Sequence, residues 1–209
     1  ASAGLILGVI YGILPLFFSQ QGYDLDTTAK FMAATVSGGM ILQYPLGRLS
    51  DHFDRRKVLI SLFSATVLLS FTYLYIGETS DFLLTCTLLF LLGGMVFSIY
   101  PISLGHACDE LSHEEMISAN QGLLLSYSIG AMAGPIIASV FISSVGAMGM
   151  FAYFASLSIF VVLFLLLRLF IRDAIPLEEH IAYASTTPNT PLMAELDPRG
   201  DHDDDVDSR

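Results

Sequence analysis

Basic residues and cysteines are scarce in this sequence, and each scarcity excludes a class of protein. Only nine of the 209 residues are lysine or arginine, so the chain lacks the basic face that nucleic-acid binding requires. Cys86 lies inside a long apolar run and Cys108 in a polar segment, where they are not expected to meet in an oxidising compartment. Neither a nucleic-acid-binding protein nor a disulfide-stabilised scaffold is expected.

Charged residues of both signs are also scarce outside the C-terminal tail. They make up 14% of the chain, whereas soluble domains carry about 25%. The net charge is −11, and residues 173–209 contribute −8 of it through ten acids and two arginines. Because prolines and acids cannot build a core, this tail is predicted to be a disordered cytoplasmic segment, separate from residues 1–172.

The N-terminus has neither the charged region nor the small-residue cleavage site of a signal peptide. The chain begins at Ala1 instead of Met and is apolar almost at once. We interpret this start as a cut inside a longer protein.

Long apolar segments, by contrast, are abundant. Hydrophobic residues make up 54% of the chain and the mean hydropathy is +0.65. A helix rises about 1.5 Å per residue, so about 20 apolar residues cross the roughly 30 Å hydrocarbon core of a bilayer. The predicted fold class is therefore an all-α integral membrane protein. Its six predicted transmembrane helices cover residues 2–19, 27–46, 58–76, 82–104, 116–142 and 148–171.

The segment between the second and third predicted helices sets the topology. Residues 48–57 contain four of the nine basic residues, and short basic loops stay on the cytoplasmic side of a membrane. Loops alternate sides, so residues 105–115 and the tail are also predicted to be cytoplasmic. Of all the basic residues, only Lys30 then lies outside.

Prolines and glycines follow a pattern of two groups of three. The first, second, fourth and fifth apolar segments each contain glycines and one proline, whereas the third and sixth contain no proline and almost no glycine. Interrupted helices at corresponding places in two halves indicate a 3+3 inverted-repeat transporter. The alternative is that glycine and proline are simply common in membrane helices.

Polar and aromatic residues recur at helical spacing within the proline-containing segments. Polar groups cost free energy when they face lipid, so they should face protein or a water-filled cavity. The alternative is that small and polar residues only mediate helix packing. The candidate cavity-lining residues are Tyr11, Gln43, Phe97, Tyr100, Asn120, Gln121, Tyr127 and Ser128, and Phe17 is an additional aromatic candidate.

The basic segment resembles the signature loop of the major facilitator superfamily, in which a glycine, an acid four residues later and a basic cluster follow one another. Two positions depart from that pattern, since His52 replaces a basic residue and Asp54 a second glycine. The resemblance implies a latch that stabilises one state of the transporter. The alternative is that these charges only set topology. The implied latch residues are Gly47, Asp51, Arg55, Arg56 and Lys57.

The fifth apolar segment carries a second, weaker resemblance. Its residues Gly130, Gly134 and Pro135 are similar to a glycine–proline element of drug/proton antiporters of the same superfamily, which implies close helix packing and efflux. In those antiporters the element belongs to the N-terminal half. The departures in the signature loop, the start at Ala1 and the terminal tail favour the C-terminal half, equivalent to helices 7–12.

These features predict part of a secondary active transporter for a small organic or amphiphilic solute. No acid lies in the middle of any predicted helix, so a coupling residue is expected in the missing N-terminal half, if the protein is ion-coupled at all. Neither a cofactor, nor a metal, nor enzymatic activity is expected, and the predicted location is a bacterial inner membrane. The alternative is a self-contained six-helix membrane module, which could act as a dimer.

The predicted cytoplasmic loop at residues 105–115 has two interpretations. Asp109 or Glu110 could pair with basic residues of the missing half. Alternatively, Ser112 and Glu115 have the spacing of a capping box that begins the fifth helix.

Overall fold

The computed structural model describes residues 1–76, 81–108 and 113–171, and all the regular structure in that part of the chain is helical. The all-α fold class is confirmed. Buried apolar residues of several helices belong to one core, among them Ile6, Phe31, Leu62, Leu89 and Phe154. The helices are α1 (Ser2–Gly12), α2 (Leu14–Gln20), α3 (Leu25–His52), α4 (Arg55–Ile76), α5 (Phe82–Cys108), α6 (His113–Val145) and α7 (Gly149–Ile171).

Five helical segments of the described chain are long and apolar enough to cross a membrane: Ser2–Gln20, Arg55–Ile76, Phe82–Ala107, Ala119–Val145 and Gly149–Leu169. The segment predicted as the second transmembrane helix, within α3, is not among them, so the number six is not confirmed. Lys30, Gln43 and several small residues lower the hydropathy of α3. Gln43, Gly38 and Gly39 are buried inside the bundle, where they do not meet lipid.

The prediction of four proline-interrupted helices is wrong for three of them. The first apolar segment is divided at Ile13, and Pro15 lies in the first turn of α2. In contrast, Pro45, Pro101 and Pro135 lie inside the continuous helices α3, α5 and α6. A proline removes one backbone hydrogen bond, but membrane helices tolerate it when neighbouring groups satisfy the freed carbonyl.

The basic segment is mostly helical, which corrects its prediction as a loop. Helix α3 continues through Gly47 to His52, and α4 begins at Arg55. Only Phe53 and Asp54 separate the two helices. Hydropathy falls at Gly47, but the helical backbone does not end there, because arginine, leucine and serine remain compatible with a helix once it leaves the apolar layer.

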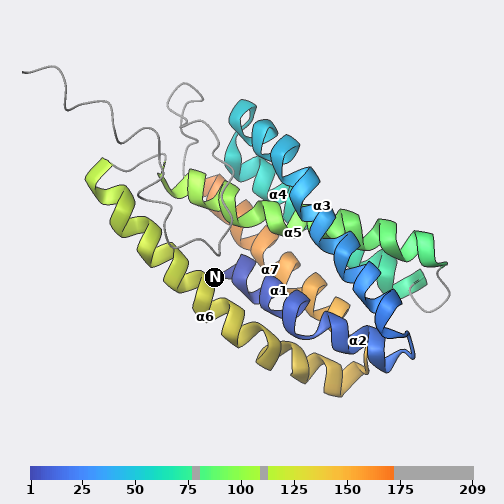
Figure 1. Ribbon diagram of the computed structural model, residues 1–209. Coiled ribbons are helices and arrows are strands. Elements are labelled where there is room, and N and C mark those ends of the chain that lie inside the picture. Colours follow the sequence, from blue (N-terminus) through green and yellow to red (C-terminus); the bar gives the residue numbers. More distant parts are fainter. Residues whose placement is uncertain (77–80, 109–112, 172–209) are drawn as a thin grey trace, which may run out of the picture.

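The helices pack in three pairs. Helix α3 packs along α5, α6 along α1, and α4 along α7, with α5 also in contact with α4. Figure 1 shows α6 beside α1 on one side of the bundle and α3 with α5 on the other. The first pair joins the second and fourth apolar segments, and the second pair joins the fifth and first. In a 3+3 repeat the first segment is equivalent to the fourth and the second to the fifth. The two pairs are therefore equivalent contacts, as such a repeat requires.

Glycines let the backbones of two of these pairs meet. A Cβ added at Gly38 would lie 1.8 Å from the carbonyl oxygen of Phe90 in α5, and one at Gly93 would lie 1.9 Å from that of Thr35 in α3. At the other crossing, a Cβ at Gly4 would lie 2.1 Å from the carbonyl oxygen of Tyr127. No side chain fits at such distances, so both crossings depend on glycine.

Asp24 begins α3 as its N-cap. Its carboxylate accepts a hydrogen bond of 3.2 Å from the backbone N–H of Thr27. The hydrogen bonds to Thr27 lower the pKa of Asp24 from its ordinary value of 3.8, because they stabilise the charged form.

This cap predicts a pH dependence of stability. Since the folded pKa of Asp24 is depressed, its contribution is present above about pH 3.8 and is lost as pH falls through the lower folded value. Thermal unfolding midpoints measured from pH 6 downwards should therefore decline less steeply in Asp24→Asn, which keeps the capping oxygen without titrating. Identical pH profiles for the two proteins would contradict this role.

Candidate functional site

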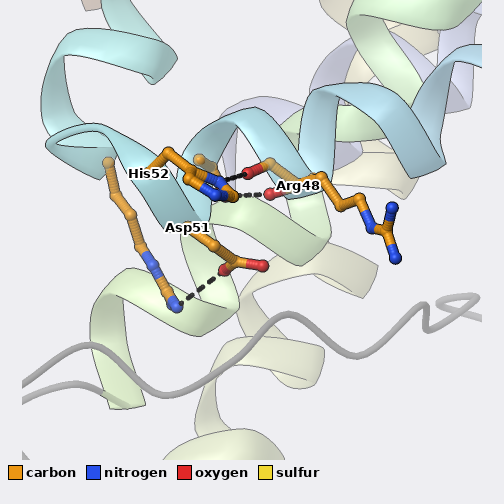
Figure 2. Close-up of polar contacts among 6 residues, drawn as sticks. Arg48, Asp51 and His52 are labelled. Carbon is orange, nitrogen blue, oxygen red and sulfur yellow. Dashed lines mark hydrogen bonds and ion pairs between the residues drawn. The ribbon is translucent and has the colours of Figure 1, made fainter.

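The turn between α3 and α4 holds an ion pair and a buried helix end. The Asp51 carboxylate lies 3.4 Å from a guanidinium nitrogen of Arg55, and Figure 2 shows Asp51 reaching across this short connection. Gly47 and Ser50 are buried, and the Ser50 hydroxyl donates a 2.8 Å hydrogen bond to the Gly47 carbonyl. The end of α3 is thus packed against the bundle.

Arg48 and His52 are exposed residues near Asp51, and both contact residues of their own helix, α3. His52 Nδ1 lies 2.8 Å from the Arg48 carbonyl oxygen (Figure 2), and Nδ1 carries the hydrogen because a carbonyl oxygen only accepts. The Arg48 guanidinium lies 4.8 Å from the centroid of the Tyr44 ring, within range of a cation–π interaction. His52 therefore secures the last turn of α3.

Asp54 has a structural role that sequence reasoning missed. Its carboxylate accepts a 2.9 Å hydrogen bond from the Arg56 backbone N–H, and its carbonyl accepts one from Val58. Asp54 therefore caps the N-terminus of α4. An aspartate just before a helical run is a recognised start signal, but the resemblance to the family loop directed attention to the glycine that it replaces.

The implied latch residues differ in exposure. Arg55 is 3% exposed and Arg56 is 4% exposed, while Lys57 is exposed. The structure thus brings Gly47, Asp51 and Arg55 together inside this bundle. That these residues form a latch which stabilises one state of a transporter stays a prediction, and Lys57 is the member that is exposed.

Four of the candidate cavity-lining residues form two ring pairs across three helices. Tyr11 of α1 and Phe97 of α5 have ring centroids 5.9 Å apart at 74°, and Tyr100 of α5 and Tyr127 of α6 are 5.1 Å apart at 63°. A Cβ at Gly39 would lie 2.6 Å from Cγ of Phe97, so α3 also meets this ring. Edge-to-face contacts of this kind are favourable.

The rings differ in how open they are. Tyr11 is 49% exposed, whereas Tyr100 is 8% exposed and Tyr127 is 9% exposed. One pair therefore presents an aromatic face to the outside of this bundle, and the other is part of its core. We refer to Tyr11, Phe97, Tyr100 and Tyr127 as the aromatic wall.

The polar candidates lie on α3 and α6. Gln43 is 8% exposed and lies one helical turn from Gly39 on α3. Asn120 is half-buried and Gln121 is exposed, both on the first half of α6. Ser128 is exposed and donates a 2.9 Å hydrogen bond to the Leu124 carbonyl of its own helix.

Phe17 is not part of the aromatic wall. It is 3% exposed and contacts Phe18, Tyr73 and Phe151. These contacts lie at the opposite end of the bundle from the α3–α4 turn. The sequence identified Phe17 as an aromatic candidate, but it could not show that Tyr73 of α4 and Phe151 of α7 cover its ring.

The helix-packing candidates line the crossing of α6 with α1. A Cβ at Gly130 would lie 2.4 Å from the carbonyl oxygen of Ala1, and one at Gly134 would lie 2.2 Å from that of Leu5. Pro135 lies beside Gly12, where an added Cβ would be 3.5 Å from its ring.

The loop candidates cannot be placed in the same way. Asp109, Glu110 and Ser112 lie outside the described residues, as does the predicted tail at residues 173–209. The pairing and capping interpretations of residues 105–115 both stay predictions.

Comparison with known proteins agrees with the sequence resemblance. A family described as Major Facilitator Superfamily matches residues 1–193. Proteins named "Uncharacterized MFS-type transporter YcaD" from Salmonella paratyphi B, Salmonella newport and Salmonella heidelberg are each 34% identical over 166 residues. The match covers 79% of this chain and 42% of each relative, so the chain spans about two fifths of the length of these proteins.

Proposed function

The chain belongs to the major facilitator superfamily, and we propose on that premise that it is half of a secondary active transporter. The solute is a small organic or amphiphilic molecule, and it is moved by alternating access. The observation that carries the proposal is the aromatic wall, where rings of α1, α5 and α6 meet and Tyr11 presents an open aromatic face. Aromatic surface binds apolar and amphiphilic solutes well.

The partner of this half is the N-terminal six-helix half of the same transporter. The chain is equivalent to helices 7–12, and the solute binds near the bilayer midplane between the two bundles. The match covers only 42% of each relative, which supports a whole transporter with a second bundle of similar size. In this proposal the chain acts without a cofactor or metal and as a transporter instead of an enzyme.

The chain is a multi-pass membrane protein, and we place it in a bacterial inner membrane. Residues 48–57 and 105–115 and the C-terminal tail face the cytoplasm in this proposal, because the basic residues gather on that side. The resemblance of Gly130, Gly134 and Pro135 to the antiporter element implies efflux as the direction of transport. A self-contained six-helix module is the second candidate.

Reconstitution separates the two candidates. The native full-length polypeptide is inserted into liposomes, and the uptake of a fluorescent amphiphilic dye is measured against empty liposomes and against a heat-inactivated sample. A transporter accumulates or equilibrates its solute faster than both controls. If a broad panel of amphiphilic dyes, sugars and amino acids crosses no faster than in empty liposomes, the transporter proposal is rejected in favour of the module.

Exchange of Asp51 for Asn tests the latch at the α3–α4 turn. The substitution removes the charge that faces Arg55 at 3.4 Å. Hydrogen bonds to charged groups contribute about 1.5–3 kcal/mol, so loss of this one from a single conformational state should slow transport about tenfold. Membrane insertion should be unchanged, because the helices remain apolar.

Asp26→Asn is a matched control. Asp26 also pairs with a basic residue four positions later on α3, Lys30, but both side chains are more than half exposed, and such pairs contribute little. The initial transport rate of each variant is compared at equal amounts of inserted protein. Normal turnover in Asp51→Asn would remove the latch role.

A further inference from the structure

Arg55 fills the space that a side chain at Gly105 would occupy. A Cβ added at Gly105 would lie 1.9 Å from Nη1 of Arg55 and 2.9 Å from its Cζ. The Arg55 side chain is only 3% exposed, so its guanidinium is held inside the bundle instead of extending into solvent. The planar group of α4 thus lies directly against the backbone of α5.

The helix dipoles explain why Arg55 lies there. Arg55 is in the first turn of α4, where the partial positive charge of the helix end disfavours a cation. Gly105 is in the last turn of α5, where the terminal carbonyls carry a partial negative charge. The guanidinium is therefore attracted to the neighbouring helix end and, on its other side, to the Asp51 carboxylate at 3.4 Å.

Helix α5 connects this contact to the aromatic wall. It lies at the centre of the bundle, in contact with α1, α3, α4 and α6 (Figure 1). Two helical turns separate Gly105 from Phe97, and Pro101 lies between them. Since Pro101 removes one hydrogen bond of the helix, α5 bends more easily at this place than a continuous helix would.

From these contacts we propose that Gly105 is a positioning residue. Because glycine has no side chain, the Arg55 guanidinium can lie against α5 at this position. This contact, which we call the seat, holds the C-terminal end of α5 to the α3–α4 turn. The end of α5 in turn sets the position of Phe97 and Tyr100. This inference rests on the proposed function in one respect only, which is that movement of the turn during transport would reach the solute-binding rings through α5.

A fluorescent reporter tests the seat without any knowledge of the solute. The sequence contains no tryptophan, so Phe97→Trp in the native full-length polypeptide adds a fluorescent reporter on α5. Its emission is obtained by subtracting the emission of the parent protein without this substitution. We expect Gly105→Ala to change the acrylamide quenching constant of this tryptophan about twofold, because the added Cβ must displace the guanidinium. Gly122→Ala, where an added Cβ meets nothing within 4 Å, should leave the constant unchanged.

Removing the guanidinium should abolish the effect. In an Arg55→Leu background, Gly105→Ala should change the constant by less than about a fifth, because two substitutions that act through one contact are not additive. A Gly105→Ala protein that fails to fold is replaced by Arg55→Lys, which keeps the charge but lacks the planar fork, and which should also shift the signal.

Two outcomes would overturn the proposal. One is an unchanged quenching constant in folded Gly105→Ala or, where that variant does not fold, in folded Arg55→Lys. The other is an equal change with and without the guanidinium. A stability role alone would lower the unfolding midpoint without moving the signal of the folded protein. Because the readout needs no solute, failure of the seat is separate from failure of the transport proposal.

Discussion

Gly38→Ala should destabilise the folded protein by about 3 kcal/mol, at the upper end of what overpacking costs. The added Cβ would lie 1.8 Å from the Phe90 carbonyl oxygen, 2.6 Å from its carbonyl carbon and 2.8 Å from its Cα. All three are backbone atoms, so no side chain can rotate to make room. Helices α3 and α5 must separate, and the van der Waals contacts along their whole crossing weaken together.

The measurement is the fraction of protein that remains monodisperse after heating in detergent, followed by size-exclusion chromatography. Gly122→Ala is the control, because its Cβ would meet nothing within 4 Å and alanine favours a helix by up to about 1 kcal/mol over glycine. Gly93→Ala acts at the same crossing from the α5 side. Once the helices have separated, the second substitution should cost less than the first, whereas full additivity would contradict a shared crossing.

The general architecture could be predicted because hydropathy reports directly on the lipid environment. It could not show which residues of α3 face the bundle. Gln43 and Gly39 lower the hydropathy of α3, yet both are buried, while Met40 and Ile41 of the same helix are exposed. Polar residues on the buried face of a helix and polar residues exposed to solvent lower its mean hydropathy equally. Only the position of the neighbouring helix distinguishes them.

The ends of the helices were less predictable than their existence. Gly47 reads as a helix end because hydropathy falls there, but its backbone is helical and its neighbour Ser50 is buried. The true end depends on Asp54, whose carboxylate caps α4 and leaves only two residues for the turn. Such a cap is a local hydrogen bond, and hydropathy averaged over a window of residues does not detect it.

The candidate site was predictable in its residue types but not in its contacts. Helical spacing placed Tyr11 and Phe97 on proline-containing helices, and the structure pairs their rings. It could not show that Arg55 lies against Gly105, since that contact joins residues 50 positions apart through a helix-end dipole. Periodicity shows which face a residue occupies. Which helix covers that face is a property of the whole bundle.

Phe151→Ala should be the most destabilising of the proposed substitutions, by about 3–5 kcal/mol. Phe151 is 0% exposed. Its ring stacks on Tyr73 with centroids 3.9 Å apart at 17°, and it also meets Phe17 and Phe154 edge to face. Alanine would leave a ring-sized cavity where α2, α4 and α7 meet, and such packing holds membrane helices together in the absence of a hydrophobic driving force.

Phe160→Ala is the matched control for this cavity. It lies on the same helix, but its side chain is 68% exposed, so its removal leaves no internal void and should cost less than about 1 kcal/mol. Phe151→Leu should fall between the two, because it keeps most of the volume but loses the ring contacts. Heating curves of the three variants in the same detergent compare them directly. Equal midpoints for Phe151→Ala and Phe160→Ala would show that this aromatic cluster does not hold the end of the bundle opposite the α3–α4 turn.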